Sequence, residues 1–288
     1  LQGRTLQGTA LAGVTIGGAA VAELTLSGTS FSGTIDGRTL RGRDFIGAVF
    51  QEVTPDGAIA TVQIRDIAPD PQDPRGQRLL YALWSEDPQH QLSGPACQPD
   101  PSGDQRALPL HGTWDERGDF TDSAGTFSFA CTAGVLAKCA RWGYEPWATR
   151  DGVPLRDHHQ ACTRLARADY CGDGTPSTQD GTLIDIYDGL GIQQRDPSPL
   201  LLFDGAWTPQ GAYCMSKERW LTLQNVLSLS CRLRFVNLGL LNLLEPSPVS
   251  SADVCVLKRT DLSRDQVLID NRAGLNVGLG GITIGLGP

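Results

Sequence analysis

The first 50 residues of the chain repeat with a period of five residues. Each unit opens on an apolar residue, first at Leu1, Leu6, Leu11, Ile16, Val21, Leu26 and Phe31. A glycine follows two places later in every one of these units except that of Val21, where Glu23 takes its place. After a slip of one residue, the pattern resumes at Ile35, Leu40, Phe45 and Phe50. Because helices repeat about every 3.6 residues and strands every two, this period indicates neither element by itself.

A repeat this short is typical of a solenoid that turns a corner at each unit. Glycine permits the backbone bends that such corners need. The segment resembles the pentapeptide-repeat proteins, whose fold is a square β-helix, although the small residue that this family favours two places before the apolar one is irregular here. The resemblance implies a β-helix of about two and a half coils, which needs a cap from the rest of the chain or from another subunit. The alternative is a flexible glycine-rich linker.

Eight cysteines are dispersed through the chain, at Cys97, Cys131, Cys139, Cys162, Cys171, Cys214, Cys231 and Cys255. None has the C-x-x-C spacing of a zinc or redox motif. An even number of scattered cysteines predicts disulfides formed in an oxidising compartment, and the alternative is a set of buried free thiols. Eight cysteines allow 105 pairings, so the sequence does not give the connectivity.

Charge and hydropathy exclude several classes of partner. The net charge of −8 repels phosphate backbones and anionic lipids, so we expect no binding of nucleic acid or of a membrane surface. No apolar run approaches the roughly 20 residues of a membrane-spanning helix.

The sequence starts at Leu1 and its only methionine is Met215, which suggests that a leader has been removed. Together with disulfides, this predicts a protein that is secreted or held on the outer cell surface. The basic residues are nearly all arginine, a bias that by itself indicates no function.

Local patterns predict a mostly β chain with short helices, of the α+β class. Strands are expected at 58–67, 79–84 and 200–207, and a hairpin with a following strand within 113–129. Helices are expected at 133–142, 155–169 and 220–229, and a short strand around Cys255. In the second helix we expect Arg156, Arg164 and Arg167 to be solvated. The aromatic residues Trp142, Tyr144, Trp147 and Tyr170 are expected to pack in or beside the core, and the alternative is a platform for glycan or peptide.

One region is similar to a known family. The blocks that carry the similarity are Phe129–Trp147, His159–Gly174 with Ala168-Asp169-Tyr170-Cys171 at its centre, and Asp180–Asp188. They resemble the ADYC-domain family, over about residues 125–235. The family occurs in proteins of myxobacteria and their relatives that are predicted to be exported, and LQGT-type repeats ahead of the domain fit the resemblance. The resemblance implies export and a shared fold, and it implies no chemistry, cofactor or catalytic residue.

Catalytic interpretations are weak. His158 and His159 lie close to Cys162, but a cysteine nucleophile needs a free thiolate, which a disulfide removes. With Asp157 these histidines lack the helical spacing of metal ligands. Carboxylates for hydrolysis or for calcium could come from Asp169, Asp173, Asp180, Asp185 and Asp188, although Asp-Gly pairs such as Asp173-Gly174 are ordinary turn sequences. We therefore predict no catalytic, metal or cofactor site, and treat a secreted hydrolase as an alternative.

The C-terminal tail alternates apolar residues with small or polar ones, which is the pattern of a strand. Such a strand could pair with the chain's own N-terminal repeat or add to a neighbour's open edge. The predicted assembly interface comprises Leu6, Leu11, Ile16, Leu26, Phe31, Leu275, Val277, Leu279, Ile282, Ile284 and Leu286.

The sequence thus suggests three parts: a repeat segment at 1–50 that forms a short β-helix, a disulfide-rich domain at 51–262 and a tail at 263–288. The leading hypothesis is a non-enzymatic structural protein whose main partner is itself, forming an extracellular fibre through repeat and tail. The alternatives are a monomeric cell-surface module that binds glycan or peptide, and the secreted hydrolase.

Overall fold

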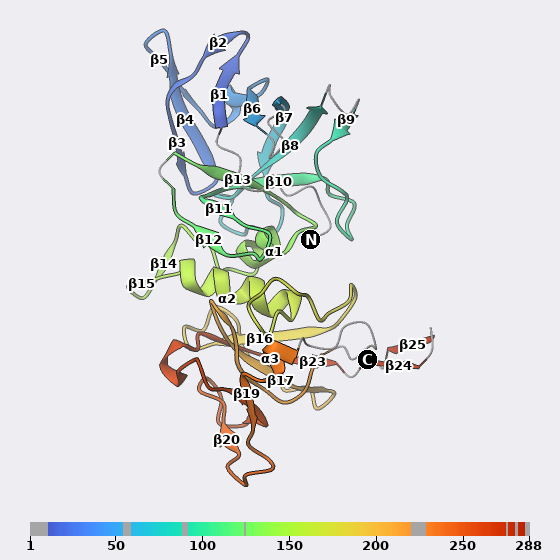
Figure 1. Ribbon diagram of the computed structural model, residues 1–288. Helices are drawn as coiled ribbons and strands as arrows, with labels where there is room; N and C mark the ends of the chain where they lie inside the picture. Colours follow the sequence, from blue (N-terminus) through green and yellow to red (C-terminus); the bar gives the residue numbers. More distant parts are fainter. Residues whose placement is uncertain are drawn as a thin grey trace. The chain divides into compact units, whose positions relative to one another are not determined.

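A computed structural model describes residues 11–53, 59–87, 92–123, 125–219, 229–274, 276–279 and 282–285. The chain divides into two compact units, Leu1–Arg141 and Trp142–Pro288, which are described separately. Strands predominate in both units and the helices are short, as the sequence predicts (Figure 1). The division falls between Arg141 and Trp142, whereas the sequence patterns suggest boundaries after residues 50 and 262.

Unit 1 is built on an eight-stranded antiparallel sheet with the order β13-β10-β8-β7-β6-β1-β2, in which β9 also pairs with β8. The strands are β1 Leu11–Ile16, β2 Ala19–Ala20, β6 Val49–Val53, β7 Ile59–Pro69, β8 Leu79–Asp87, β9 Leu92–Pro95, β10 Arg106–His111 and β13 Phe127–Cys131. The predicted strands at 58–67 and 79–84 are therefore confirmed as β7 and β8.

A second, three-stranded sheet and a small hairpin complete unit 1. The sheet contains β3 Ala22–Ser27, β4 Ser30–Ile35 and β5 Arg38–Arg41, followed by the 3-10 turn η1 Gly42–Phe45. The hairpin joins β11 Thr113–Trp114 to β12 Phe120–Thr121, where the sequence predicts one. The unit ends with the helix α1 Val135–Arg141, inside the predicted 133–142.

The β-helix expected for the repeat is not what residues 11–50 form. Their strands pair antiparallel, whereas a β-helix stacks successive coils in parallel. The reason lies in the glycines, of which Gly18, Gly28, Gly37 and Gly47 have positive φ, while Gly13 and Gly33 lie inside strands. The chain therefore runs straight through some glycines and reverses at others, which produces hairpins instead of corners. Residues 1–10, and with them Leu6, lie outside the described residues.

The apolar residues of the repeat pack together in the core of unit 1. Phe31 and Phe45 are fully buried and Phe50 nearly so, and Ile16, Val21, Leu26 and Ile35 pack against the same cluster. The Phe31 ring lies 4.9–5.9 Å, centroid to centroid, from the rings of Phe45, Phe50, Tyr81, Phe127 and Phe129. The repeat segment and residues up to 129 therefore form one hydrophobic core.

Buried ion pairs hold the loops of unit 1 against α1. Arg141 donates to Asp70, Asp100 and Asp104 at 3.1–3.2 Å, with its side chain only 5% exposed. Arg78 binds Asp70 at 2.9 Å and the Ala140 carbonyl at 3.1 Å. Burial alone would raise the pKa of Asp100, but hydrogen bonds from Ser102, the Asp104 amide and Arg141 lower it. Asp100 therefore stays ionised and acts as an anchor for the Arg141 guanidinium.

Unit 2 contains a six-stranded antiparallel sheet with the order β16-β23-β17-β18-β22-β19. Its strands are β16 Ile184–Asp188, β17 Leu201–Thr208, β18 Gly211–Met215, β19 Phe235–Asn237, β22 Leu257–Arg259 and β23 Ile269–Gly274. The helix α2 Arg156–Arg167 lies against β17, β18 and β23. Strand β17 and helix α2 confirm the predictions at 200–207 and 155–169.

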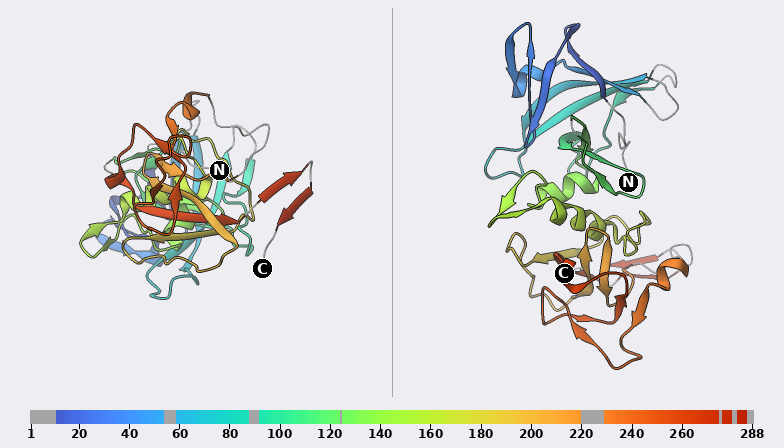
Figure 2. Two further views of the ribbon diagram at one scale, coloured as in Figure 1. Left: turned by 90° about the horizontal axis from the view of Figure 1, so that it is seen from below. Right: turned by 60° about the vertical axis from the view of Figure 1, so that its left-hand side comes forward.

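Smaller elements decorate unit 2. They are the hairpins β14 Thr149–Arg150 with β15 Val153–Pro154, β20 Glu245–Pro246 with β21 Val254–Cys255, and β24 Asn276–Leu279 with β25 Ile282–Gly285, together with α3 Leu229–Arg232 and the 3-10 turn η2 Arg264–Gln266. The tail hairpin β24–β25 extends away from the six-stranded sheet (Figure 2). Most of the helix expected at 220–229 lies outside the described residues.

All eight cysteines are disulfide-bonded, and the described part of the chain has no free thiol. Cys97–Cys131 lies in unit 1, and Cys171–Cys231 and Cys214–Cys255 lie in unit 2. Each joins segments 34 to 60 residues apart, for which loop closure predicts about 4 kcal/mol of stabilisation apiece. The disulfide prediction is therefore confirmed.

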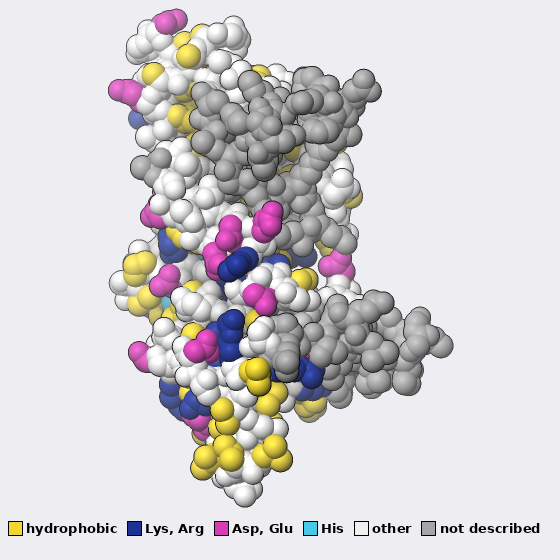
Figure 3. Space-filling view, in the orientation of Figure 1, with side chains coloured by type: hydrophobic (Ala, Val, Ile, Leu, Met, Phe, Trp, Pro, Cys, Tyr) yellow, Lys and Arg dark blue, Asp and Glu magenta, His cyan; other side chains and the backbone are white. Residues whose placement is uncertain are grey.

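Apolar side chains also reach the surface of unit 2. Leu233, Leu240, Leu241, Leu243 and Leu244 are each more than half exposed. Figure 3 shows hydrophobic side chains gathered at the end of this unit that carries β19 and β20 in Figure 1. Within the described ranges, no helix has the length and apolar character needed to cross a membrane.

The core position of the repeat gives the first testable prediction. Changing Phe31 to Ala should lower the free energy of unfolding by about 3–5 kcal/mol, because it empties the centre of an aromatic cluster. Thr39→Ala, at an exposed position of β5, is the control and should cost little. Chemical denaturation of the full chain measures both. Equal, small losses would mean that the repeat does not belong to this core.

Candidate functional site

The four residues Ala168-Asp169-Tyr170-Cys171 follow directly on α2 and are the centre of the candidate site. Ala168 ends the helix in the left-handed conformation, with φ 50° and ψ 43°, and its amide donates to the carbonyls of Arg164 and Leu165. This conformation turns the chain sharply out of the helix. Ala168, Asp169 and Tyr170 are fully buried and Cys171 is 5% exposed. The motif is therefore enclosed by the protein.

Asp169 fixes the turn that follows the helix. Its carboxylate accepts hydrogen bonds from the amides of Asp173 and Gly174, and from the guanidinium of Arg164 at 2.7 Å. Burial raises the pKa of Asp169, and the charge of Arg164 opposes this. A carboxylate that is enclosed and bound on both oxygens is an anchor for the backbone, so its geometry does not favour attack on a substrate.

Tyr170 connects the helix end to the sheet. Its hydroxyl donates to Asp204 of β17 at 2.6 Å and accepts the Arg219 amide at 2.7 Å. Arg219 in turn binds the other Asp204 oxygen at 2.6 Å, and Asn271 of β23 donates to that same oxygen at 2.8 Å. Burial raises the pKa of Tyr170 well above its ordinary value, so the hydroxyl keeps its proton. The tyrosine thereby joins three segments of the unit through one buried polar network.

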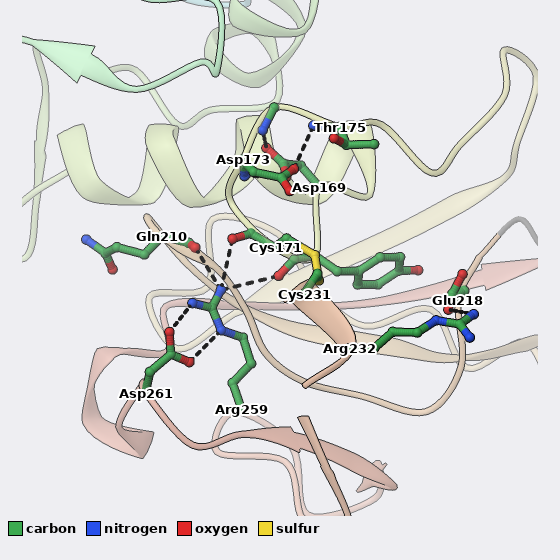
Figure 4. Close-up of a disulfide and its surroundings, with 12 residues drawn as sticks. Asp169, Cys171, Asp173, Thr175, Gln210, Glu218, Cys231, Arg232, Arg259 and Asp261 are labelled. Carbon is green, nitrogen blue, oxygen red and sulfur yellow. Dashed lines mark hydrogen bonds and ion pairs between the residues drawn. A yellow bond between two sulfur atoms is a disulfide. The ribbon is translucent and has the colours of Figure 1, made fainter. Parts of the chain in front are cut away.

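Cys171 completes the motif with the disulfide to Cys231 (Figure 4). Beside it, the Arg259 guanidinium donates to the carbonyls of Cys171 at 3.2 Å and Gln210 at 3.1 Å, and it pairs with Asp261 at 2.6 Å. Arg259 is 3% exposed. A planar guanidinium can serve several acceptors at once, which suits it to holding together loop carbonyls that lack a strand partner.

Two glycines allow the motif to lie directly on the β17–β18 turn. Gly172 has φ +65°, and a Cβ there would lie 2.1 Å from the Gln210 carbonyl oxygen. Gly211 has φ +115°, and a Cβ there would lie 2.7 Å from the Tyr170 carbonyl oxygen. The Tyr170 carbonyl instead accepts the Ala212 amide at 3.0 Å. This backbone contact therefore requires both glycines.

A second buried polar cluster lies on β16 and β23. Tyr187 donates to Asp253 at 2.6 Å, Arg195 pairs with the same Asp253 oxygen at 3.1 Å, and Ser247 bonds to Asp270. Asp270 is fully buried, and its Oδ1 has no hydrogen-bond partner in the structure. Burial, with the nearby charge of Asp253, raises the pKa of Asp270 to about 7. This carboxyl therefore changes protonation near neutral pH.

The residues considered for catalysis have structural partners. Cys162 is disulfide-bonded, which removes the thiolate that a cysteine nucleophile needs. His158 is buried in α2, and its ring stacks on that of Tyr144 with centroids 6.3 Å apart. Both residues therefore contribute to packing.

Of the other aspartates considered for hydrolysis or calcium, Asp173 and Asp180 lie in loops, and Asp185 and Asp188 lie in β16. Asp173 accepts the Thr175 amide, Asp185 accepts the Asp196 amide, and Asp188 accepts the Tyr144 hydroxyl at 2.8 Å. Asp180 is exposed. In the described ranges, no three His, Cys, Asp or Glu side chains gather in a group that could hold a metal ion. Asp173, Asp185 and Asp188 therefore serve as hydrogen-bond acceptors for the chain's own amides and hydroxyls.

The expectation that the arginines of α2 are solvated is wrong for two of them. Arg164 is 1% exposed and Arg167 7% exposed, whereas Arg156 is half-buried. Arg164 donates to the Pro209 carbonyl at 3.1 Å and Arg167 to the Gly174 carbonyl. Their acceptors come from loops outside the helix, so helical periodicity gave no signal for them. Tyr144 and Tyr170 are core residues, and Trp142 and Trp147 are half-buried.

The residues of the predicted assembly interface separate into two groups. Phe31 is buried in unit 1 and Ile16 and Leu26 pack on its core, while Leu11 lies in β1. Val277 and Leu279 lie in β24, and Ile282 and Ile284 lie in β25. Leu6, Leu275 and Leu286 are outside the described residues. The four described tail residues therefore belong to the separate two-stranded sheet β24–β25, whereas the described repeat residues belong to unit 1.

The network around Tyr170 gives a prediction for stability. Tyr170→Phe should lower the free energy of unfolding by about 1–3 kcal/mol, because it leaves the buried Arg219 amide unpaired and removes one bond to Asp204. Tyr144→Phe is the matched control, since it also removes one hydroxyl bond, here to the half-buried Asp188, and should cost less. Urea denaturation compares the two. A larger loss for Tyr144→Phe would contradict the role given to Tyr170.

Asp270 gives a prediction for pH dependence. Folding raises its pKa from 3.8 to about 7, so between these values the folded chain holds a proton that the unfolded chain has released. The stability from this group is full below about pH 4 and is lost as the pH rises through 7, by about 4 kcal/mol in all. Asp270→Asn cannot ionise and should flatten this decline. Denaturation of both proteins from pH 4 to 8 measures the difference, and parallel curves would contradict the shifted pKa.

Comparison with known proteins supports the family suggested by the sequence. No curated protein matches the chain, and no solved structure matches it either. The sequence profile of the ADYC domain, by contrast, matches residues 42–221. This match covers more than half of the chain, starts within the core of unit 1 and includes the motif of buried residues described above. The chain therefore belongs to the ADYC-domain family.

Proposed function

We propose that this chain is an exported, non-enzymatic structural protein that self-associates through its C-terminal strands into an extracellular or surface fibre. The hairpin β24–β25 is the observation that supports this most. In the described part of the chain its strands pair only with each other, although β24 comes soon after β23, an inner strand of the six-stranded sheet. The tail thus leaves the body of unit 2 as a separate two-stranded sheet.

The physical chemistry of such a hairpin favours a further partner. A two-stranded hairpin is marginally stable in water, and the outer edge of each strand offers unpaired backbone groups. Its register pairs Val277 with Ile284 and Leu279 with Ile282, so the apolar residues are matched across the strands. Strand addition from a neighbouring copy would satisfy the open edge. A head-to-tail contact of this kind grows into a filament unless it closes into a ring.

The rest of the molecule fits a structural role outside the cell. Disulfides persist in oxidising compartments, and every cysteine here is in one. The apolar side chains of the repeat that the sequence analysis assigned to assembly, Ile16, Leu26 and Phe31, serve the core of unit 1. The proposal therefore gives assembly to the tail alone.

Electron microscopy of negatively stained protein tests this proposal. The variant to compare with the full chain lacks residues 275–288, because Ala273 and Gly274 belong to β23 and pair with its neighbours. A second variant, Val277→Pro with Ile284→Pro, keeps the length but removes two amide donors. A chain lacking only residues 287–288, which are not part of the predicted interface, is the control. We expect filaments from the full chain and the control, and none from the two variants.

Uniform single particles from the full chain, with a mass that does not change with concentration, would contradict self-assembly. That result would favour the monomeric glycan- or peptide-binding module. Filaments from every variant would show that assembly uses a surface other than the tail.

A further inference from the structure

The loop between β19 and β20 presents leucines to solvent. Leu240 is 82% exposed, Leu243 61%, Leu244 56% and Leu241 53%. Leu233, which precedes β19, is 76% exposed. Large apolar side chains this exposed and this close in sequence are unusual on a soluble protein, and such patches mark interaction surfaces. The residues Leu238–Leu244 are called the leucine loop below.

Four consecutive amides of the leucine loop, from Leu240 to Leu243, have hydrogen-bond acceptors in the loop or next to it. The amides of Leu241 and Leu243 donate to the Leu238 carbonyl at 3.2 and 2.9 Å, and the Asn242 amide donates to Gly239. The Leu240 amide donates to the Asn237 side chain at 3.2 Å. A segment that enters hydrocarbon must meet this condition, because lipid tails offer no replacement for water. The loop therefore exposes apolar side chains while these four amides keep hydrogen-bond partners within the protein.

The leucine loop is also fixed to the body of unit 2. Leu238 is 6% exposed, packs in the core cluster around Phe203 and Tyr213, and donates its amide to the Val256 carbonyl at 2.8 Å. On one side β19 pairs with β22, and on the other β20 pairs with β21, which carries the Cys214–Cys255 disulfide. The exposed leucines are thus held in place before any partner binds, which lowers the entropic cost of binding.

The leucine loop carries no charged residue, and the acidic residue that follows it is paired with basic side chains. No residue from Phe235 to Leu244 is charged. The next residue, Glu245, is bound by Lys258 at 2.5 Å and lies 3.7 Å from Arg264. In Figure 3 few charged side chains lie among the hydrophobic ones at this end of the unit. No uncompensated acid within this stretch opposes its entry into an apolar phase.

We propose that the leucine loop inserts into the surface of a phospholipid bilayer and docks the protein there. A fluid acyl layer accepts a set of protruding leucines without a complementary pocket, whereas a protein partner must supply one. The hydrogen-bonded amides of Leu240 to Leu243 and the absence of charge in the loop both lower the cost of insertion. The net charge of −8 opposes anionic lipid, so the attraction is apolar and is strongest for neutral bilayers. Net charge alone predicts no binding to a membrane surface, and the loop adds a local attraction that net charge does not reveal.

Vesicle flotation tests the proposal with the full chain. The probes are phosphatidylcholine vesicles and vesicles that also contain phosphatidylglycerol. The loop variant is Leu240→Ser with Leu243→Ser, and the matched control is Leu183→Ser with Leu200→Ser, which changes two other leucines exposed by 51% and 55%. We expect the full chain and the control to bind phosphatidylcholine vesicles, the loop variant to bind at least tenfold more weakly, and phosphatidylglycerol to weaken binding. Unchanged thermal unfolding of both variants shows that they fold.

Three results would overturn the proposal. One is a full chain that does not float with either vesicle, and another is an equal loss of binding in the loop variant and the control. The third concerns the protein without lipid. If the mass of the full chain rises with concentration and that of the loop variant does not, the loop is an interface between copies of the chain. The chain lacking residues 275–288 should still bind vesicles, so failure of tail assembly and failure of lipid binding are separate outcomes.

Discussion

Buried arginines hold this fold together, because their guanidinium groups bind loop carbonyls and carboxylates that no strand reaches. Arg141 binds three aspartates in unit 1. In unit 2, Arg259 gathers the carbonyls around the disulfide, Arg272 binds those of residues 196, 198 and 201, and Arg219 binds Asp204. Lysine has one charged atom and cannot span several acceptors in this way. The strong preference for arginine in the composition therefore has a structural explanation.

These pairs fix the arrangement of the chain more than they stabilise it. Removing two charges from water costs about as much as their attraction returns, so a buried pair adds little net stability. Breaking one partner, however, leaves an uncompensated charge, which makes any alternative loop arrangement costly. Around Tyr170, buried hydrogen bonds likewise connect the end of α2 to strands β17 and β23 and to the segment that contains Arg219. The disulfides restrict the conformations open to the unfolded chain. The buried pairs therefore act on the folded state and the disulfides on the unfolded state.

Local patterns in the sequence were sufficient for elements that depend on their own residues. Alternation in 58–67 predicted β7, whereas Phe31, assigned from the sequence to an assembly interface, is buried in the core of unit 1. The direction of strand pairing was not predictable, because it depends on which of many equivalent glycines adopt positive φ. The burial of Arg164 was also not predictable from local patterns, because its acceptor, the Pro209 carbonyl, lies 45 residues further along the chain. The partners of Tyr170 are equally distant, so the motif's contacts had no local signature.

The residues Ala168-Asp169-Tyr170-Cys171 are all enclosed by the protein, and this bears on where function can lie. A side chain that is 0% to 5% exposed and hydrogen-bonded, ion-paired or disulfide-linked to its own fold has no face to offer a partner. The motif Ala168-Asp169-Tyr170-Cys171 therefore specifies a framework, and activity must come from surfaces that the framework carries. In unit 2 the two surfaces that we propose for partners, the tail hairpin and the leucine loop, each follow a strand of the six-stranded sheet. Each can change without disturbing the buried network, so members that share this framework can differ in what they bind.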